Sequence, residues 1–171
     1  MTEIQQRFFD QLNKLGTGER AALRREAGIP IQQADGAALT TFFRCLPPVV
    51  DNRQEDKWFA IACLRCLWDP GETEEKPLPQ LIAELLQRSE LSDSTGHRIE
   101  NLLDTRWDGD GYMLTKLARL VKLVKQKSGG TIIDFSGLLD DLIRWNFDTQ
   151  PVQRKWARMI FTNETMIEEK E

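Results

Sequence analysis

Apolar residues recur along this chain mostly at intervals of three and four, the spacing that places side chains on one face of an α-helix. In the first segment, residues 3–15, the side chains of Ile4, Phe8, Leu12 and Leu15 follow this spacing. Glycine or proline closes most of the segments, as expected for residues that end helices. The pattern predicts further helices at residues 18–28, 35–46, 51–68, 78–89, 92–107, 112–127, 134–145 and 151–161.

Strand signals are weak by comparison. The best candidate is the β-branched stretch at residues 131–135, but no second stretch offers it a pairing partner, so we expect it to stay unpaired. The sequence therefore predicts an all-α protein, a compact bundle of about eight or nine short helices. Two helical halves are expected, at residues 1–93 and 94–162, followed by an acidic tail at residues 163–171.

The chain is ordinary in composition and mildly acidic. Of its 171 residues, 40% are hydrophobic and 29% charged, and the formal net charge is −4. The loop at residues 69–76 and the tail at 163–171 together hold eight acids and two lysines, so the remaining chain has 21 basic and 19 acidic residues. The folded body is thus slightly basic, and a polyanionic partner is not excluded.

The expected cellular compartment follows from two features that are not found in the sequence, a membrane span and a secretory signal. No apolar run approaches the roughly 18 residues that a membrane span needs. The first twelve residues are rich in acids and glutamines and do not resemble a secretory signal. We therefore expect a cytoplasmic protein without membrane contact.

Candidate catalytic and metal-ligating residues are few. Cys45, Cys63 and Cys66 are predicted to be buried free thiols, because zinc binding by the Cys63–Cys66 pair needs further ligands and the chain has a single histidine. The acid pairs Asp108/Asp110 and Asp140/Asp141 lack the convergent carboxylates of a metal nuclease, and structural or capping roles are expected. No phosphate-binding loop or dinucleotide fingerprint occurs. We predict a protein with no catalytic residues, no metal site and no cofactor.

The segment at residues 112–127 has the most informative charge pattern. No acid occurs between Tyr112 and Ile133, whereas five cations do. At about 100° per residue, the apolar side chains at positions 117, 120, 121 and 124 share one side. Arg119, Lys122 and Lys125 fall on the opposite side, and Lys116 lies between. The functional interpretation is a phosphate-binding ridge, and the alternative is a solvated face that lacks acids.

Further cations cluster on other segments. Residues 18–25 place Arg20 and Arg24 on one face, with Arg25 beside them, although nearby glutamates could neutralise part of this charge. In the last segment, Arg154 and Arg158 share one face, whereas Trp156 lies on another and is expected in the core. Arginine suits phosphate oxygens because its planar guanidinium donates in a fork and keeps its charge.

These basic segments, in this order, resemble the CasB family, the small subunit of the type I-E CRISPR surveillance complex Cascade. The matching stretches are GERAALRR, FFRCLPP, HRIENLLDTRWDGDGYMLTKLARLVKLVKQK and IDFSGLLDDLIRWNFDTQPVQRKWARMIF. They span nearly the whole chain, and the closing stretch, with leucine pairs, Trp145, a break and VQRKWAR, is the most specific. The chain departs from the family at LLDTRW, where Asp104 replaces extra positive charge and could pair with Arg106.

The resemblance implies an all-α, non-catalytic subunit. Two copies would sit head to tail in the ribonucleoprotein beside the backbone and large subunits. Basic surface residues would hold the guide RNA–target DNA hybrid and the displaced strand without reading sequence. Carried over by position, the nucleic-acid-binding residues implied are Arg25, Arg53, Arg98, Arg119 and Arg154, supported by Arg20, Arg24, Arg44, Lys116, Lys122 and Arg158.

Two other hypotheses remain open from the sequence. A helical adaptor could use the same basic face to bind an acidic protein. A metal-dependent nuclease is a weaker alternative, which EDTA-sensitive cleavage would support.

Overall fold

A computed structural model describes residues 1–72 and 74–162 of the chain. These residues fold into nine α-helices, two 3₁₀ turns, one π-helical turn and two short strands. The elements are α1 (Glu3–Asn13), α2 (Thr17–Arg25), η1 (Ile31–Gln33), α3 (Gly36–Cys45), η2 (Asn52–Gln54), α4 (Glu55–Arg65), β1 (Glu75–Lys76), α5 (Leu78–Gln87), α6 (Ser94–Leu103), α7 (Tyr112–Lys127), β2 (Ile132–Ile133), α8 (Phe135–Ile143), α9 (Pro151–Ala157) and η3 (Arg158–Thr162).

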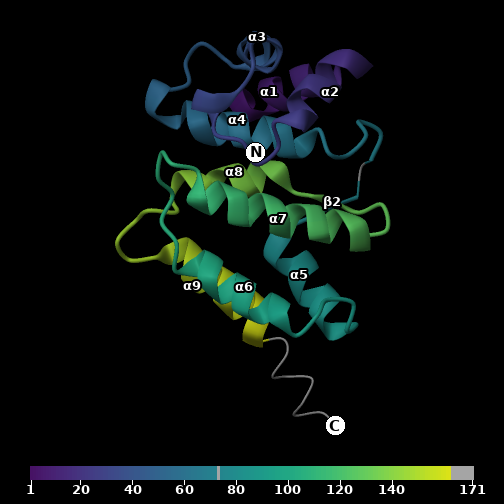
Figure 1. Cartoon of the computed structure of the whole chain (residues 1–171), viewed down its shortest axis with the longest axis vertical. Helices are drawn as coiled ribbons and strands as arrows, with labels where there is room; N and C mark the ends of the chain where they lie inside the picture. The colour runs from purple at the N-terminus through teal and green to yellow at the C-terminus, as the bar shows by residue number, and fades with distance from the viewer. Residues whose placement is uncertain (73, 163–171) are drawn as a thin grey trace.

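The helices form three tiers along the long axis of the molecule (Figure 1). The first four helices occupy one end, α7 and α8 cross the middle, and α5, α6 and α9 lie at the other end. One continuous apolar cluster runs through all three tiers, from Phe8 on α1 to Ile160 on η3. The predicted all-α bundle is confirmed.

Helix α4 is the centre of this core. All eight residues from Trp58 to Arg65 are buried, so the helix has no exposed stripe. It packs against α2 on one side and against α7 and α8 on the other. A helix that is covered all round needs apolar residues all round, which explains why residues 51–68 show less amphipathic contrast than the other segments.

The predicted strand at residues 131–135 does have a partner, and the expectation that it stays unpaired is wrong. Ile132 and Ile133 pair in parallel with Glu75 and Lys76. The Asp134 main-chain N–H donates to the Lys76 carbonyl at 2.8 Å, which extends the pairing by one bond. The partner lies in the acid- and proline-rich loop, whose composition gave no strand signal. Tertiary packing brings the two segments together.

Elements from both predicted halves pack on one another. Helix α5 belongs to residues 1–93, yet it packs against η3 at the end of the described chain. Helix α4 likewise packs against α8. The division at residues 93/94 therefore remains a prediction about folding units, and the acidic tail at 163–171 lies outside the described residues.

The three cysteines are buried free thiols, as expected. Burial raises the pKa of the Cys45 thiol to about 11 and also raises the pKa values of Cys63 and Cys66. The thiols therefore stay protonated and act as small apolar groups in the core. No helix of the described chain is both long and apolar enough to cross a bilayer.

The carboxylate of Asp141 on α8 ties the last helix to the core. It is buried and accepts a hydrogen bond from Trp156 Nε1 at 2.8 Å and another from the Lys155 ammonium. The Trp156 ring also meets the Trp145 ring edge to face, with centroids 5.3 Å apart. Both the structural role expected for Asp141 and the core position expected for Trp156 are confirmed.

We predict that Asp141→Ala lowers the free energy of unfolding by about 3 kcal/mol, because it leaves the Trp156 indole N–H and the Lys155 ammonium without their acceptor. Urea unfolding followed by tryptophan fluorescence measures this change. The neighbouring Asp140 is exposed and accepts from Gln5 Nε2 at 2.7 Å, so Asp140→Ala is the matched control. Equal losses for both variants would contradict the assignment.

Candidate nucleic-acid interface

Three predicted cations meet in a groove between α6 and α7. The groove has a volume of about 470 Å³ and is lined by Arg98, Asn101, Leu102, Lys116, Arg119, Leu120 and Leu123. None of these lining residues is a carboxylate. Arg98 comes from α6, whereas Lys116 and Arg119 come from α7, so the fold joins charges that the sequence separates by 18 or more residues. Three leucines, at positions 102, 120 and 123, form what we call the leucine floor of the groove, and the three cations form its cationic rim.

Helical periodicity explains how each helix presents these cations. On α7, Leu117, Leu120, Val121 and Val124 are buried, which confirms the predicted core side. On α6, Ile99 and Leu102 are buried and leave Arg98 and Asn101 exposed. Lys116 is further held by donating a hydrogen bond from its ammonium to Thr105 Oγ1 at 3.1 Å. Both walls of the groove are therefore anchored by the core beneath them.

The predicted ridge on α7 is divided rather than continuous. The Lys122 ammonium turns toward the first tier and donates to the Ala27 carbonyl, just beyond α2, at 3.1 Å. The Lys125 ammonium lies over the Trp68 ring, 5.6 Å from its centroid. Only Lys116 and Arg119 of the five cations line the groove. The helix is packed on several sides, so its long cations reach different neighbours.

Arg20 is the clearest correction to the predicted site. Only 5% of the residue is exposed, and its guanidinium donates to the carbonyls of Leu12 at 3.1 Å and Trp68 at 2.6 Å. Its role is therefore to join α1, α2 and the end of α4, not to face a phosphate. The prediction that Arg20 and Arg24 share one exposed face is wrong, because Arg20 is buried and Arg24 is exposed.

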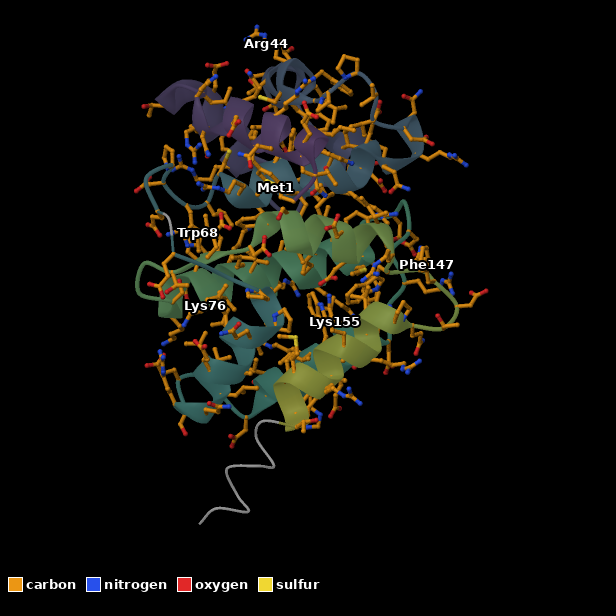
Figure 2. The ribbon with its side chains drawn as sticks, turned by 180° about the vertical axis from the view of Figure 1, so that it is seen from behind. Met1, Arg44, Trp68, Lys76, Phe147 and Lys155 are labelled. Atoms are coloured by element: carbon orange, nitrogen blue, oxygen red, sulfur yellow. The ribbon has the colours of Figure 1, made fainter. Side chains whose placement is uncertain are left out.

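The other predicted cations of the first tier, Arg24, Arg25, Arg44 and Arg53, are exposed. Arg24 and Arg25 lie in the last turn of α2, where positive charge favours the carbonyl end of the helix. Arg44 projects from the far end of the molecule, and its guanidinium lies 3.4 Å from a Glu19 carboxylate oxygen (Figure 2). These residues lie in a different tier from the α6–α7 groove.

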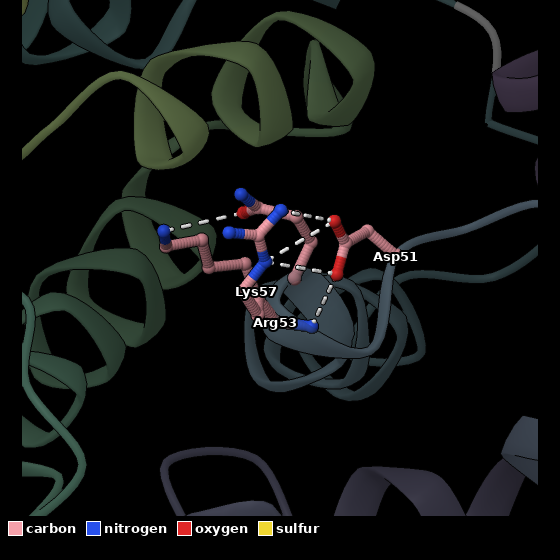
Figure 3. Close-up of polar contacts among 4 residues, drawn as sticks. Asp51, Arg53 and Lys57 are labelled. Atoms are coloured by element: carbon pink, nitrogen blue, oxygen red, sulfur yellow. Dashed lines mark hydrogen bonds and ion pairs between the residues drawn. The ribbon is translucent and has the colours of Figure 1, made fainter.

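Arg53 is engaged by a neighbouring acid. Its Nη2 lies 2.8 Å from Asp51 Oδ2, and its main-chain N–H donates to Asp51 Oδ1 at 2.9 Å (Figure 3). The side-chain hydrogen bond from Arg53 lowers the Asp51 pKa to about 2. Both side chains are exposed, so a phosphate could displace the carboxylate from Arg53 at small cost.

Both cations predicted for residues 151–161 lie on the surface, Arg154 on α9 and Arg158 at the start of η3. Arg154 and Arg158 are exposed, whereas Val152 and Trp156 are buried. In the described residues no carboxylate pairs with either arginine. Arg106, which the sequence places within reach of Asp104, instead donates to the Asn146 carbonyl at 3.2 Å.

Two residues beside the groove escaped sequence reasoning. Asn101 lines it with an amide, and Tyr112 stands at the start of α7 with its ring 4.3 Å from the Lys116 ammonium. Tyr112 and Lys116 are four residues apart, so helical spacing was the signal that could have linked them. The described residues contain no cluster of three or more His, Cys, Asp or Glu side chains suited to a metal ion.

The fold and the site define a class: an all-helical protein that carries a cation-rimmed groove on its surface. The chain belongs to a family described as CRISPR-associated protein Cse2, whose model matches residues 19–161. The CRISPR-associated protein Cse2 of Thermus thermophilus is 32% identical over 96% of this chain and 94% of its own length. The resemblance to the CasB family is thereby confirmed.

Solved structures agree with this assignment. The crystal structure of a Cse2-family protein from Thermus thermophilus has a TM-score of 0.75 and 28% identity, and covers 95% of this chain and 99% of its own. The M. ruber CasB structure has a TM-score of 0.74 at 24% identity, with coverage of 100% and 99%. A chain of a CRISPR RNA-guided surveillance complex has a TM-score of 0.72 at 23% identity, with coverage of 98% and 95%. The last two likenesses concern the fold.

Proposed function

We propose that this protein is a non-catalytic subunit of a type I-E CRISPR surveillance complex. In this proposal its exposed cations hold the guide RNA–target DNA hybrid and the displaced strand by their phosphates, while guide pairing supplies the sequence specificity. Its partners would be guide RNA, target and non-target DNA, the backbone and large subunits, and a second copy of the chain.

The observation that carries this proposal is the α6–α7 groove. Arg98, Lys116 and Arg119 converge there from two helices, with no carboxylate among the lining residues. In the described chain, Arg98 and Arg119 have no ion-pair partner, so their guanidinium groups are open to an incoming anion. A leucine floor between cations suits a strand that places phosphates on the rim and sugar or base against the floor.

The comparisons support the assembly part of the proposal. The chain belongs to the Cse2 family, and a chain of the same fold occurs in a CRISPR RNA-guided surveillance complex. The adaptor hypothesis uses the same cations but requires an acidic protein as the ligand. Competition by an unrelated oligonucleotide therefore separates the two hypotheses.

We predict binding that is independent of sequence and falls with salt. Labelled single-stranded and double-stranded DNA of two unrelated sequences are titrated into the purified protein at about 50 mM and about 200 mM salt. The complex, reconstituted with and without this subunit, is titrated with its guide-matched target. Three phosphate contacts in the groove give a log–log slope of about −2 for single strands, a loss of roughly twentyfold between these concentrations.

Equal affinities for both sequences would support phosphate tracking. A complex that binds the target equally well with and without this subunit would contradict the proposal. Binding of the protein to an acidic peptide that excess arbitrary DNA does not displace would favour the adaptor hypothesis.

A further inference from the structure

Tyr112 is an exposed aromatic residue at one end of the groove, and none of the functions above uses it. It is the single tyrosine of the chain, and 59% of the residue is exposed. It opens α7, where Gly111 in the left-handed conformation (φ 82°) turns the chain into the helix. More than half of this residue lies in solvent, so burial in the core does not explain its position.

The ring lies on the same stripe of α7 as the groove residues. At about 100° per residue, Tyr112, Lys116, Arg119 and Leu123 fall within roughly 60° of one another. The last three line the groove, so Tyr112 extends that line beyond Lys116 by one helical turn. The Tyr112 ring therefore lies one helical turn beyond the groove, in contact with the ammonium of Lys116 at its edge.

The contact with Lys116 fixes how the ring is presented. The ammonium lies 4.3 Å from the ring centroid and also donates to Thr105 Oγ1. Thr105 Oγ1 in turn donates to the Asn101 carbonyl of α6 at 2.6 Å. Lys116 is thus held by the opposite wall and covers one part of the ring, while most of Tyr112 stays open to solvent.

We propose that Tyr112 is a base-stacking platform for an unpaired nucleotide whose neighbouring phosphates lie on Lys116, Arg119 and Arg98. Stacking needs a base face that is free, and a duplex offers one only at its ends. The groove therefore takes a single strand in preference to a paired one. This inference rests on the proposed function, and it names the strand type and the residue that selects it.

The test separates stacking from charge by removing bases while keeping phosphates. The wild-type subunit, within the reconstituted complex and alone, is titrated with a thymidine oligonucleotide and with an abasic oligonucleotide of equal length and charge. The wild type is expected to bind the thymidine strand roughly tenfold more tightly. Tyr112→Leu should lose this preference, and Tyr112→Phe should keep it.

Controls distinguish a stacking role from a structural one. Phe43→Ala removes another exposed aromatic residue, on α3 in the first tier, and should keep the full preference for bases. Affinity of Tyr112→Leu for the abasic strand should match the wild type within about twofold, because the phosphate contacts remain. Loss of affinity for both strands would mean that Tyr112 only positions Lys116, and would overturn the proposal.

Failure of this inference differs from failure of the proposed function. One result would overturn the stacking platform alone. In that result, Tyr112→Leu keeps the preference for bases, and Arg119→Ala weakens binding to both strands. Binding that neither variant changes would overturn both, because the groove would then lie outside the nucleic-acid path.

Discussion

Replacing Arg98 and Arg119 together with alanine is expected to weaken nucleic-acid binding roughly thirtyfold at about 50 mM salt, for every sequence alike. An exposed arginine–phosphate contact contributes about 1 kcal/mol, and the two residues lie on opposite walls of one groove. The log–log salt slope should become shallower by about 1.4 for single strands, since two counterion-releasing contacts are lost.

A matched control holds the charge change constant. Arg7 and Lys14 are exposed cations of α1 and its C-terminal cap, and Arg7 already pairs with Glu3 at 2.9 Å. Arg7→Ala/Lys14→Ala removes the same two charges from another tier and should alter affinity by less than about threefold. An equal loss in both double variants would mean that net charge, not the groove, governs binding.

Arg20→Ala is expected to destabilise the protein by about 3 kcal/mol, although its position in the sequence suggested a phosphate ligand. The substitution deletes two charge-assisted hydrogen bonds to buried carbonyls, those of Leu12 and Trp68, and leaves a cavity. The Trp68 carbonyl keeps a second donor, Arg65 Nη1 at 3.1 Å, which limits the loss. A decrease in melting temperature of roughly 9 °C should follow for a chain of this size.

Arg24→Ala is the control for this prediction, because Arg24 lies one turn further along the same helix and is exposed. It should change the free energy of unfolding by less than about 0.5 kcal/mol. Urea denaturation of both variants, followed by tryptophan fluorescence, makes the comparison. If Arg20→Ala leaves the stability unchanged and weakens DNA binding, the structural role is wrong and Arg20 belongs to the nucleic-acid interface.

Most of the fold was predictable because helices depend on local spacing. The apolar positions of residues 112–127 predicted which side of α7 is buried, and the prediction is confirmed. The pairing of β2 was not predictable in this way. Its partner, Glu75–Lys76, is polar and lies 57 residues earlier along the chain, and only packing shows that the two segments touch.

The chemistry of the candidate site was predictable from the sequence, but which cations belong to the site was less predictable. Arginines at helical spacing indicated a polyanion ligand, but spacing alone does not tell whether an arginine faces water or protein. Arg20 and Arg24 share a predicted face, yet one is buried against main-chain carbonyls and the other is exposed. That difference depends on the position of α1 and the end of α4 beside α2.

The sequence by itself determined the helical class, the core side of α7 and the basic character of the folded body, because these follow from residue type and from periodicity within one segment. The tertiary structure decided which charges act together. Arg98 meets Lys116 and Arg119 because α6 packs beside α7, whereas Lys122 reaches the Ala27 carbonyl. A side chain's function depends on the neighbours that its length can reach, and those neighbours come from distant segments of the chain.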